Sequence, residues 1–144
     1  MTSDQMNTML RNELSAIETY QQALGKGEDR LARQTEFEQL AAILNDHQRA
    51  AARLETLIRK LGGTPTQDSG AWGSWSKIVM GTAKLFGEKS ALKALKEGEE
   101  SGLKEYQEVL QDPTINEDLK TDINTFAANQ IAHIRTLDEL MARF

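Results

Sequence analysis

The sequence contains no cysteine, which excludes disulfides, thiolate metal sites and thiol catalysis. It has only two prolines, and most of its ten glycines cluster in short segments between long stretches rich in Ala, Leu, Glu, Lys, Gln and Arg. No run of alternating β-branched residues occurs along the chain. Because the abundant residues all favour helix, the composition predicts an all-α protein.

Long apolar runs and an excess of basic charge are also missing. No apolar stretch approaches the 18 or so residues of a membrane span, so we expect no membrane association. The net charge is −5 with both signs interspersed, which argues against a nucleic-acid-binding surface. The first residues, MTSDQMNTMLRNE, lack the basic start and apolar core of a secretion signal. A cytoplasmic location is therefore the expectation.

The length of 144 residues suits a single domain, residues 1–144, that is large enough to bury a core. Two segments, Thr2 to Gln5 and Thr114 to Glu117, have the spacing of a helix-starting capping box. The first predicts a helix that begins near Ser3 and ends near Leu24. The second predicts the start of the last helix, whose apolar stripe continues to the final residue.

The middle of the chain differs in composition from the segments on either side. Residues 62–71 are rich in Gly, Ser, Thr and Pro, which predicts a loop, and a short helix is expected within 72–86. The second long helix begins near residue 28 or 29, and the third spans about 90–111. Short loops within each half predict antiparallel neighbours, so we expect a four-helix bundle with helix pair 1–61, crossover 62–88 and helix pair 89–144.

Each long segment carries one apolar stripe at the spacing of a buried helix face. In the first and third helices two glutamates, Glu13 and Glu99, interrupt that stripe where a leucine is expected. The first and third stripes are Met6, Leu10, Glu13, Ile17, Tyr20, Leu24 and Leu92, Leu95, Glu99, Leu103, Tyr106, Leu110. The second and fourth are Leu40, Ile43, His47, Ala50, Leu54, Leu57, Leu61 and Leu119, Ile123, Phe126, Gln130, His133, Leu137, Leu140, Phe144.

The two halves form an internal repeat. NELSAIETYQQAL at 12–24 aligns with GEESGLKEYQEVL at 98–110. The same offset places Glu13 with Glu99, and it places His47 with His133, the only two histidines. It also places Leu44 with Gln130.

The repeat predicts one polar layer inside the bundle, made of Glu13, His47, Glu99 and His133, with Gln130 one turn away. A buried carboxylate is costly unless it is paired or binds a cation. Two carboxylates and two imidazoles suit a divalent transition metal such as iron, manganese or zinc. Tyr20 and Tyr106, seven residues after each glutamate, could orient the ligands from a second layer. The alternative is a metal-free core in which glutamates and histidines pair directly.

These segments resemble the ferritin-like superfamily, and the similarity covers nearly the whole chain. NELSAIETY (12–20) is similar to the first helix of bacterioferritins, in which the Glu of this segment is an iron ligand. RLETLIRKLGGTP (53–65), SGLKEYQEVL (101–110) and QIAHIRTLDEL (130–140) are similar to the three other helices. The connection at 69–86 resembles that of a bacterial branch known as a domain of unknown function. The resemblance implies a ferritin-like bundle.

The di-iron pattern of that superfamily uses one Glu from helices one and three, and Glu-x-x-His from helices two and four. The resemblance thus implies that Glu13, Glu99, His47 and His133 occupy ligand positions, whereas Leu44 and Gln130 replace both bridging glutamates. Leucine cannot bind a metal, and a neutral amide bridges two cations poorly. Ferroxidase or oxidase activity is therefore disfavoured, and we expect a degenerate di-iron site that binds one or two metal ions, or a core that binds none.

Two functional hypotheses follow from the sequence. The first is a metal-binding bundle, a metal buffer or a weak oxidase. The second is a non-catalytic structural or stress-associated protein that acts through its surface, for example as a homodimer. Trp72 and Trp75 lie in an apolar part of the crossover, which would either pack across the bundle or form such an interface.

Overall fold

The computed structural model describes residues 1–25, 34–68 and 75–144, and every regular element in these ranges is a helix. The expectation of an all-α bundle is therefore confirmed. The described ranges contain four long helices and one short helix, which are α1 (Ser3–Ala23), α2 (Gln34–Lys60), α3 (Trp75–Phe86), α4 (Glu88–Leu110) and α5 (Glu117–Met141). The start predicted for the second helix, at residue 28 or 29, lies outside the described residues.

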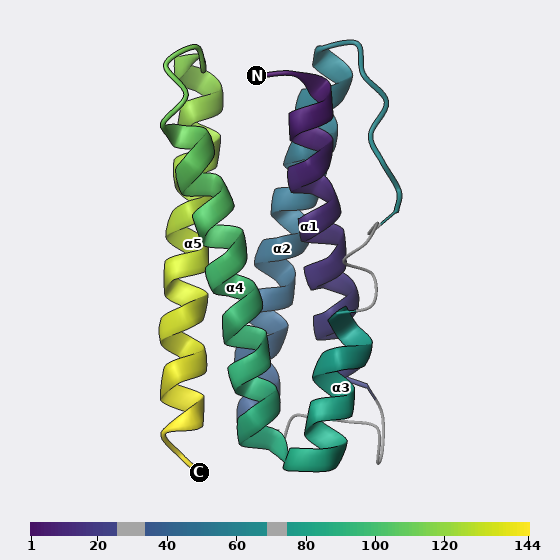
Figure 1. Ribbon diagram of the computed structural model, residues 1–144, viewed down its shortest axis with the longest axis vertical. Coiled ribbons are helices and arrows are strands. Elements are labelled where there is room, and N and C mark those ends of the chain that lie inside the picture. The colour runs from purple at the N-terminus through teal and green to yellow at the C-terminus, as the bar shows by residue number, and fades with distance from the viewer. Residues whose placement is uncertain (26–33, 69–74) are drawn as a thin grey trace.

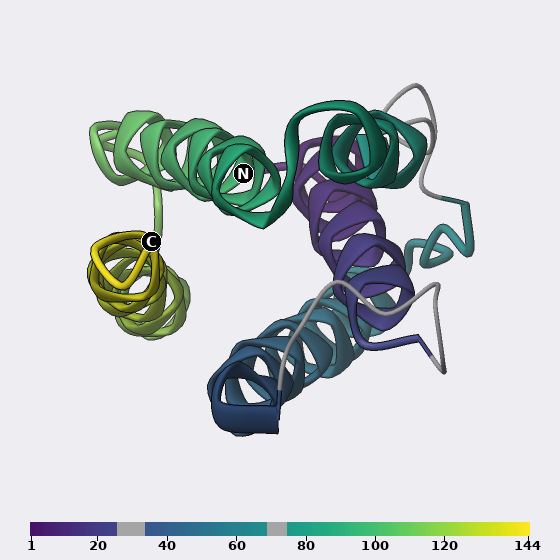
Figure 2. The ribbon, with the colours of Figure 1, turned by 90° about the horizontal axis from the view of Figure 1, so that it is seen from below.

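The long helices form two antiparallel pairs, α1 with α2 and α4 with α5 (Figures 1 and 2). Contacts between α1 and α4, and between α2 and α5, join one pair to the other. The short helix α3 packs against α1 and α4 at one end of the bundle, next to the start of α4 (Figure 1). No described helix is long and apolar enough to cross a membrane.

Of the two capping boxes predicted from the sequence, the one at Thr2 is confirmed and the one at Thr114 is wrong. Thr2 caps α1 with a complete capping box, in which the Thr2 side chain and the Gln5 side chain each bond the other's backbone N–H. Thr114 does not cap the last helix. Its backbone N–H and hydroxyl donate to the carboxylate of Asp112, and the side chain of Asn116 caps α5 instead. Asn competes well for the cap position, and it stands directly before Glu117.

The crossover begins as an extended segment held against α1. The Asn7 amide donates to the carbonyl oxygen of Thr64 at 3.0 Å, and the Asn7 side-chain oxygen accepts from the backbone N–H of Thr66 at 2.8 Å. Further along, Val79 of α3 is buried among the leucines of the bundle. Trp72 lies outside the described residues, and the side chain of Trp75 is also not described.

The core consists of two apolar clusters, one toward each end, separated by a polar layer. The first contains Met6, Leu10, Leu54, Ile58, Ile123 and Phe126, and the second contains Leu40, Ile43, Leu92, Leu95, Leu137 and Leu140. Between them lie the buried side chains of Glu13, His47, Glu99, Gln130 and His133. The predicted stripes therefore face the core along most of their length.

Two stripes deviate at their ends. In the second stripe the predicted Leu61 lies beyond α2, which ends at Lys60, and it is 54% exposed. Ile58, which is off the predicted stripe, is fully buried, so the buried face has rotated by the last turn of α2. An ideal helix drifts by about 20° per heptad relative to a strict heptad repeat, which accounts for such a rotation over three heptads. At the end of the chain, Phe144 lies beyond α5 and is 42% exposed, so the stripe does not continue to the last residue as predicted.

Gly62 ends α2 with φ +79°, a left-handed conformation that other residues adopt at a cost. We therefore expect Gly62→Ala to lower the free energy of unfolding by about 1–2 kcal/mol. Gly81→Ala is the matched control, because Gly81 is inside α3 and an added methyl would meet nothing within 4 Å. Urea denaturation should show this control to be neutral or stabilising. An equal loss of unfolding free energy in Gly62→Ala and Gly81→Ala would contradict the view that the left-handed conformation of Gly62 requires glycine.

Candidate metal centre

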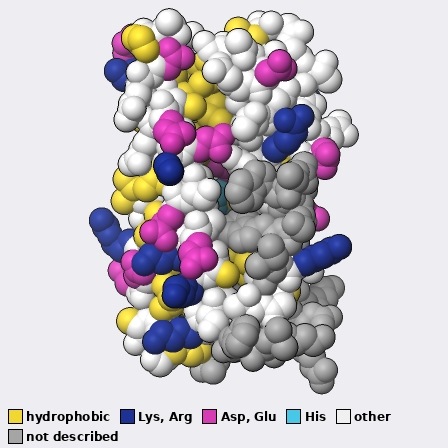
Figure 3. All heavy atoms as spheres, in the orientation of Figure 1, with side chains coloured by type: hydrophobic (Ala, Val, Ile, Leu, Met, Phe, Trp, Pro, Cys, Tyr) yellow, Lys and Arg dark blue, Asp and Glu magenta, His cyan; other side chains and the backbone are white. Residues whose placement is uncertain are grey.

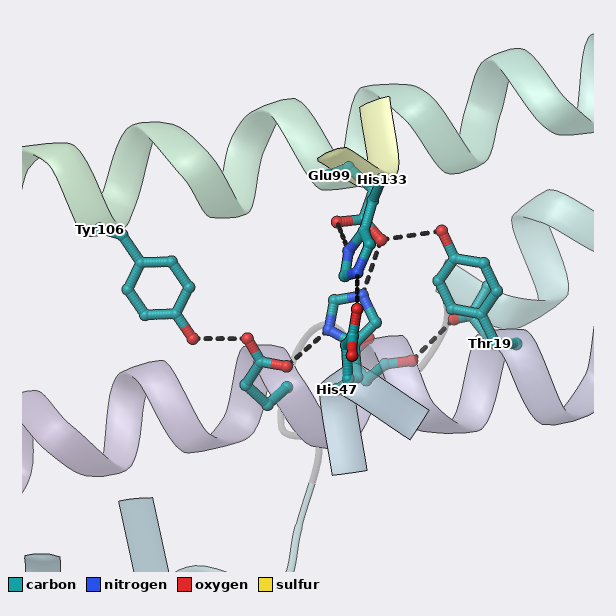
Figure 4. Close-up of polar contacts among 9 residues, drawn as sticks. Thr19, His47, Glu99, Tyr106 and His133 are labelled. Carbon is teal, nitrogen blue, oxygen red and sulfur yellow. Dashed lines mark hydrogen bonds and ion pairs between the residues drawn. The ribbon is translucent and has the colours of Figure 1, made fainter. Parts of the chain in front are cut away.

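Each of the four long helices contributes one side chain to the centre of the polar layer, as the repeat predicts (Figure 4). The four side chains are those of Glu13 from α1, His47 from α2, Glu99 from α4 and His133 from α5. All four residues are no more than 4% exposed. The structure thus brings together the four residues that the sequence singles out.

His47 lies between the two glutamates. Its Nδ1 donates to Oε2 of Glu13, and its Nε2 donates to Oε1 of Glu99, both at 2.6 Å. Burial alone lowers the pKa of His47, but the negative charges of Glu13 and Glu99 outweigh it and raise this pKa well above its usual value. His47 is therefore a cation with both N–H groups engaged.

Glu99 is the carboxylate that both histidines share. Its Oε1 accepts from His47, and its Oε2 lies 3.1 Å from Nδ1 of His133. Burial favours the neutral acid, but His47 and His133 reverse this effect and hold the pKa of Glu99 at about 2. Glu99 is therefore ionised at neutral pH, which is the form that binds a cation.

The outer nitrogen of His133 has a partner that the sequence analysis missed. Its Nε2 lies 2.8 Å from Oδ2 of Asp46, whose side chain is 35% exposed. Asp46 directly precedes His47 and is off the apolar stripe of α2, so periodicity assigns it to the surface. In the repeat, the position equivalent to Asp46 is Ala132. The two halves of the polar layer therefore differ at this point.

The two tyrosines bond the glutamates across the repeat, each to the glutamate of the other half. Tyr20 donates its hydroxyl to Oε1 of Glu99 at 2.8 Å, and Tyr106 donates to Oε1 of Glu13 at 2.5 Å. Burial, reinforced by the neighbouring glutamates, raises the pKa of both phenols well above the usual value. Both tyrosines therefore remain neutral donors, in the positions expected of groups that orient ligands.

Gln130 stands apart from this hydrogen-bonded cluster. It is 5% exposed, and its Oε1 is buried without a hydrogen-bond partner among the described residues. Its amide lies against Gly102 of α4, where an added Cβ would come within 2.3 Å of Nε2. Leu44, at the equivalent position of α2, is half-buried against the second apolar cluster. Neither residue bridges the cluster.

Within the described residues, His47, Glu99 and His133 can converge on one metal ion. One ligand atom from each lies within 4.8 Å of the other two. A tetrahedral ion with bonds of about 2.1 Å needs donor atoms that are roughly 3.4 Å apart. The 2.6 Å and 3.1 Å contacts to Glu99 are shorter than this, so small side-chain rotations would open the space.

A family model described as a domain of unknown function (DUF2383) matches residues 1–112. The chain belongs to this family. No curated protein and no solved structure matches the chain. The DUF2383 match includes Glu13, His47 and Glu99, whereas His133 and Gln130 of α5 lie beyond it.

The two histidines should differ in their effect on stability. His47→Ala leaves two buried carboxylates without their shared cation, and breaking a buried pair in this way costs about 3–5 kcal/mol. In His133→Ala, Glu99 keeps His47 and Tyr20, and Asp46 is open to water, so a loss of about 1–3 kcal/mol is expected. Urea denaturation with a chelator present measures both values. A larger loss for His133→Ala would contradict this ranking.

Proposed function

We propose that the protein binds one divalent transition-metal ion through His47, Glu99 and His133. The supporting observation is the arrangement of the two imidazoles around Glu99. Each points one nitrogen at this carboxylate and the other nitrogen at a different carboxylate, Glu13 or Asp46. Nε2 of His47, Nδ1 of His133 and one oxygen of Glu99 would be the ligand atoms.

Glu13 and Asp46 would orient the ligands. Metal-binding histidines almost always donate their second N–H to a carboxylate, a carbonyl or water, which fixes the ring and its tautomer. Glu13 holds Nδ1 of His47, and Asp46 faces Nε2 of His133. This assigns to Glu13 an orienting role in place of the ligand role that the sequence predicted. Tyr20 would hold Glu99 in the same way.

Nitrogen and carboxylate ligands without sulfur suit iron, manganese or zinc. A second ion would need a bridging carboxylate, and Leu44 and Gln130 occupy the two positions that would supply one. The proposal is therefore a one-metal site that binds or buffers an ion, without two-metal ferroxidase chemistry. The pairing of α1 with α2 and of α4 with α5, with one ligand position on each, supports assigning the bundle to the ferritin-like superfamily.

A second candidate function is a structural protein with a metal-free polar core. The observation in its favour is the pair of 2.6 Å bonds from His47 to Glu13 and Glu99, which offset part of the buried negative charge without an ion. Such a protein would act through its surface or as a homodimer. Metal binding tests both candidates at once.

The test is the metal content of tag-free protein before and after incubation with Fe(II), Mn(II) and Zn(II). We expect close to one ion per chain, and we expect Glu99→Gln combined with His133→Ala to abolish binding. Glu13→Gln and Asp46→Asn should retain the stoichiometry but weaken affinity by about 10–100-fold, as for other groups that orient ligands. Calorimetric titration measures these affinities.

Asp138→Asn is the matched control, because Asp138 forms an ion pair with Lys96 on the surface of the bundle and should not affect the metal. Complete loss of binding in Glu13→Gln would make Glu13 a ligand. A negligible metal content under all conditions would exclude the metal proposal and favour the metal-free core.

Metal affinity should rise with pH. To bind an ion, Nε2 of His47 must release the proton that it donates to Glu99, so binding displaces that proton into solution. Because the pKa of His47 is raised well above its usual value, protons should compete with the metal ion for Nε2 through neutral pH. We expect about a tenfold gain in affinity per pH unit below that pKa. Calorimetry in buffers of different ionisation enthalpy would count the proton, and a pH-independent affinity would contradict the exchange.

A further inference from the structure

A cavity of about 180 Å³ lies between α1 and α4, directly beside the polar layer. Its wall includes Glu13, His47 and Glu99 of the buried cluster. Glu97 and Ser101 also line it and are exposed, so the cavity reaches from the surface to the cluster. Figure 3 shows the face of the molecule that carries α1 and α4, with several acidic side chains near its middle.

The charged side chains around the cavity are mostly acidic. Four carboxylates line it, those of Glu13, Glu97, Glu99 and Glu105, and His47 is the one cation among the described lining residues. A cleft lined by charge of one sign, with walls of low dielectric constant, concentrates counter-ions and raises their association rate by about 10–1,000-fold. The cavity should therefore attract cations and repel anions.

Glu105 is a half-buried carboxylate on the α4 side of the cavity. Its Oε2 accepts from the side-chain amide of Asn12, so this pair joins α4 to α1. Burial raises the pKa of Glu105 despite this bond, and the charges of Glu108 and Glu13 add to the effect. The negative charge of Glu105 is therefore destabilised by its surroundings, and a cation beside it would offset this cost.

The ligand atoms at the inner end favour a metal ion over an organic cation. His47 and Glu99 belong to the group of three residues whose ligand atoms lie within 4.8 Å of one another, and both line the cavity. One water needs about 10–15 Å³ of such a cavity, whereas sites for drug-sized ligands start at about 300 Å³. The space is therefore large enough for an ion with its shell of waters and too small for a large organic molecule.

We propose that this cavity is the route by which a hydrated divalent cation enters the metal centre, with Glu97 and Glu105 as its first contacts. At the inner end the ion would exchange waters for Glu99 and for Nε2 of His47, whose proton passes to solvent. This inference rests on the proposed metal function and adds how the ion reaches buried ligands. Glu97 and Glu105 act on the rate of entry and are not ligands of the bound ion.

The rate of entry can be measured by stopped-flow absorbance with Co(II), a stand-in for Zn(II) that gains visible absorption when protein ligands bind it. The rate for the unchanged chain should fall steeply with added NaCl, because salt screens exposed charges. Glu97→Gln combined with Glu105→Gln should slow entry about tenfold at low salt and remove most of this salt dependence. Release should slow by a similar factor, so the stoichiometry and the Kd should change little.

Two single variants separate a route from a general effect of charge. Glu100→Gln removes an exposed carboxylate of α4 that is not among the described lining residues, so the entry rate should stay nearly unchanged. Asp46 contacts His133 on the other side of Glu99. Asp46→Asn should therefore weaken affinity through faster release and leave the entry rate unchanged.

A second measurement uses the metal-free protein and hexaamminecobalt(III). This complex is about the size of a hydrated ion but keeps its six ammonia ligands, so it can occupy the route without reaching the centre. It should shift the methyl NMR signal of Met9, which lines the cavity, and leave that of Met141 in the second apolar cluster unchanged. It should also slow the entry of Co(II). Both effects should be lost when Glu97 and Glu105 are replaced together.

Three results would overturn the route while the metal site stands. The first is an equal entry rate in Glu100→Gln and in the double variant, which would mean that no particular carboxylate guides the ion. The second is slower entry in Asp46→Asn alone, which would place the entrance between α2 and α5. The third is no shift of Met9 with hexaamminecobalt(III). Failure of the unchanged chain to bind Co(II) at all would instead overturn the route together with the metal proposal.

Discussion

The cation at His47, held between Glu13 and Glu99, is the interaction on which the centre of the bundle depends. Two carboxylates buried at 3% and 2% exposure would repel each other and lose their hydration without it. The two bonds of His47 join α1, α2 and α4 at one point, and Glu99 extends the connection to α5 through His133. The register of all four long helices is therefore fixed by one polar layer, whereas the apolar clusters on either side would tolerate alternative packings.

The internal repeat explains why this layer is nearly symmetric, and Asp46 explains why it is not fully so. Each histidine places Nδ1 toward the glutamate 34 residues before it, and each tyrosine bonds the glutamate of the other half. Full symmetry would place Nε2 of His133 against Glu13, but it faces Asp46 instead. Glu99 thus lies between two imidazoles and Glu13 faces only one. This asymmetry is the structural reason to expect one ion, centred on Glu99.

Periodicity was sufficient to predict the bundle and the four residues of its polar layer, because a stripe fixes which side of a helix is buried. It could not specify which nitrogen meets which oxygen, since that depends on the side-chain rotamers, which the periodicity does not determine. Asp46 was missed because it is outside the stripe and reaches His133 from the edge of α2. The end of the second stripe was predicted wrongly, because Leu61 lies beyond the end of α2 and is exposed. Ile58 is buried in its place because a straight helix drifts from a heptad repeat.

The glycines of α4 connect the polar layer with the cavity beside it. Glycine inside a helix costs about 1 kcal/mol relative to alanine, yet Gly98 and Gly102 lie one turn apart on the side of α4 that faces the cavity. At Gly102 a side chain would collide with the amide of Gln130, so glycine there lets this amide reach the cavity wall. Glu99 lies between the two glycines in sequence and projects into the layer. A helix built only for packing would fill these positions with alanine or leucine. At Gly102 the space that a side chain would take is occupied by the amide of Gln130, so this glycine lets α4 and α5 pack closely beside the polar layer.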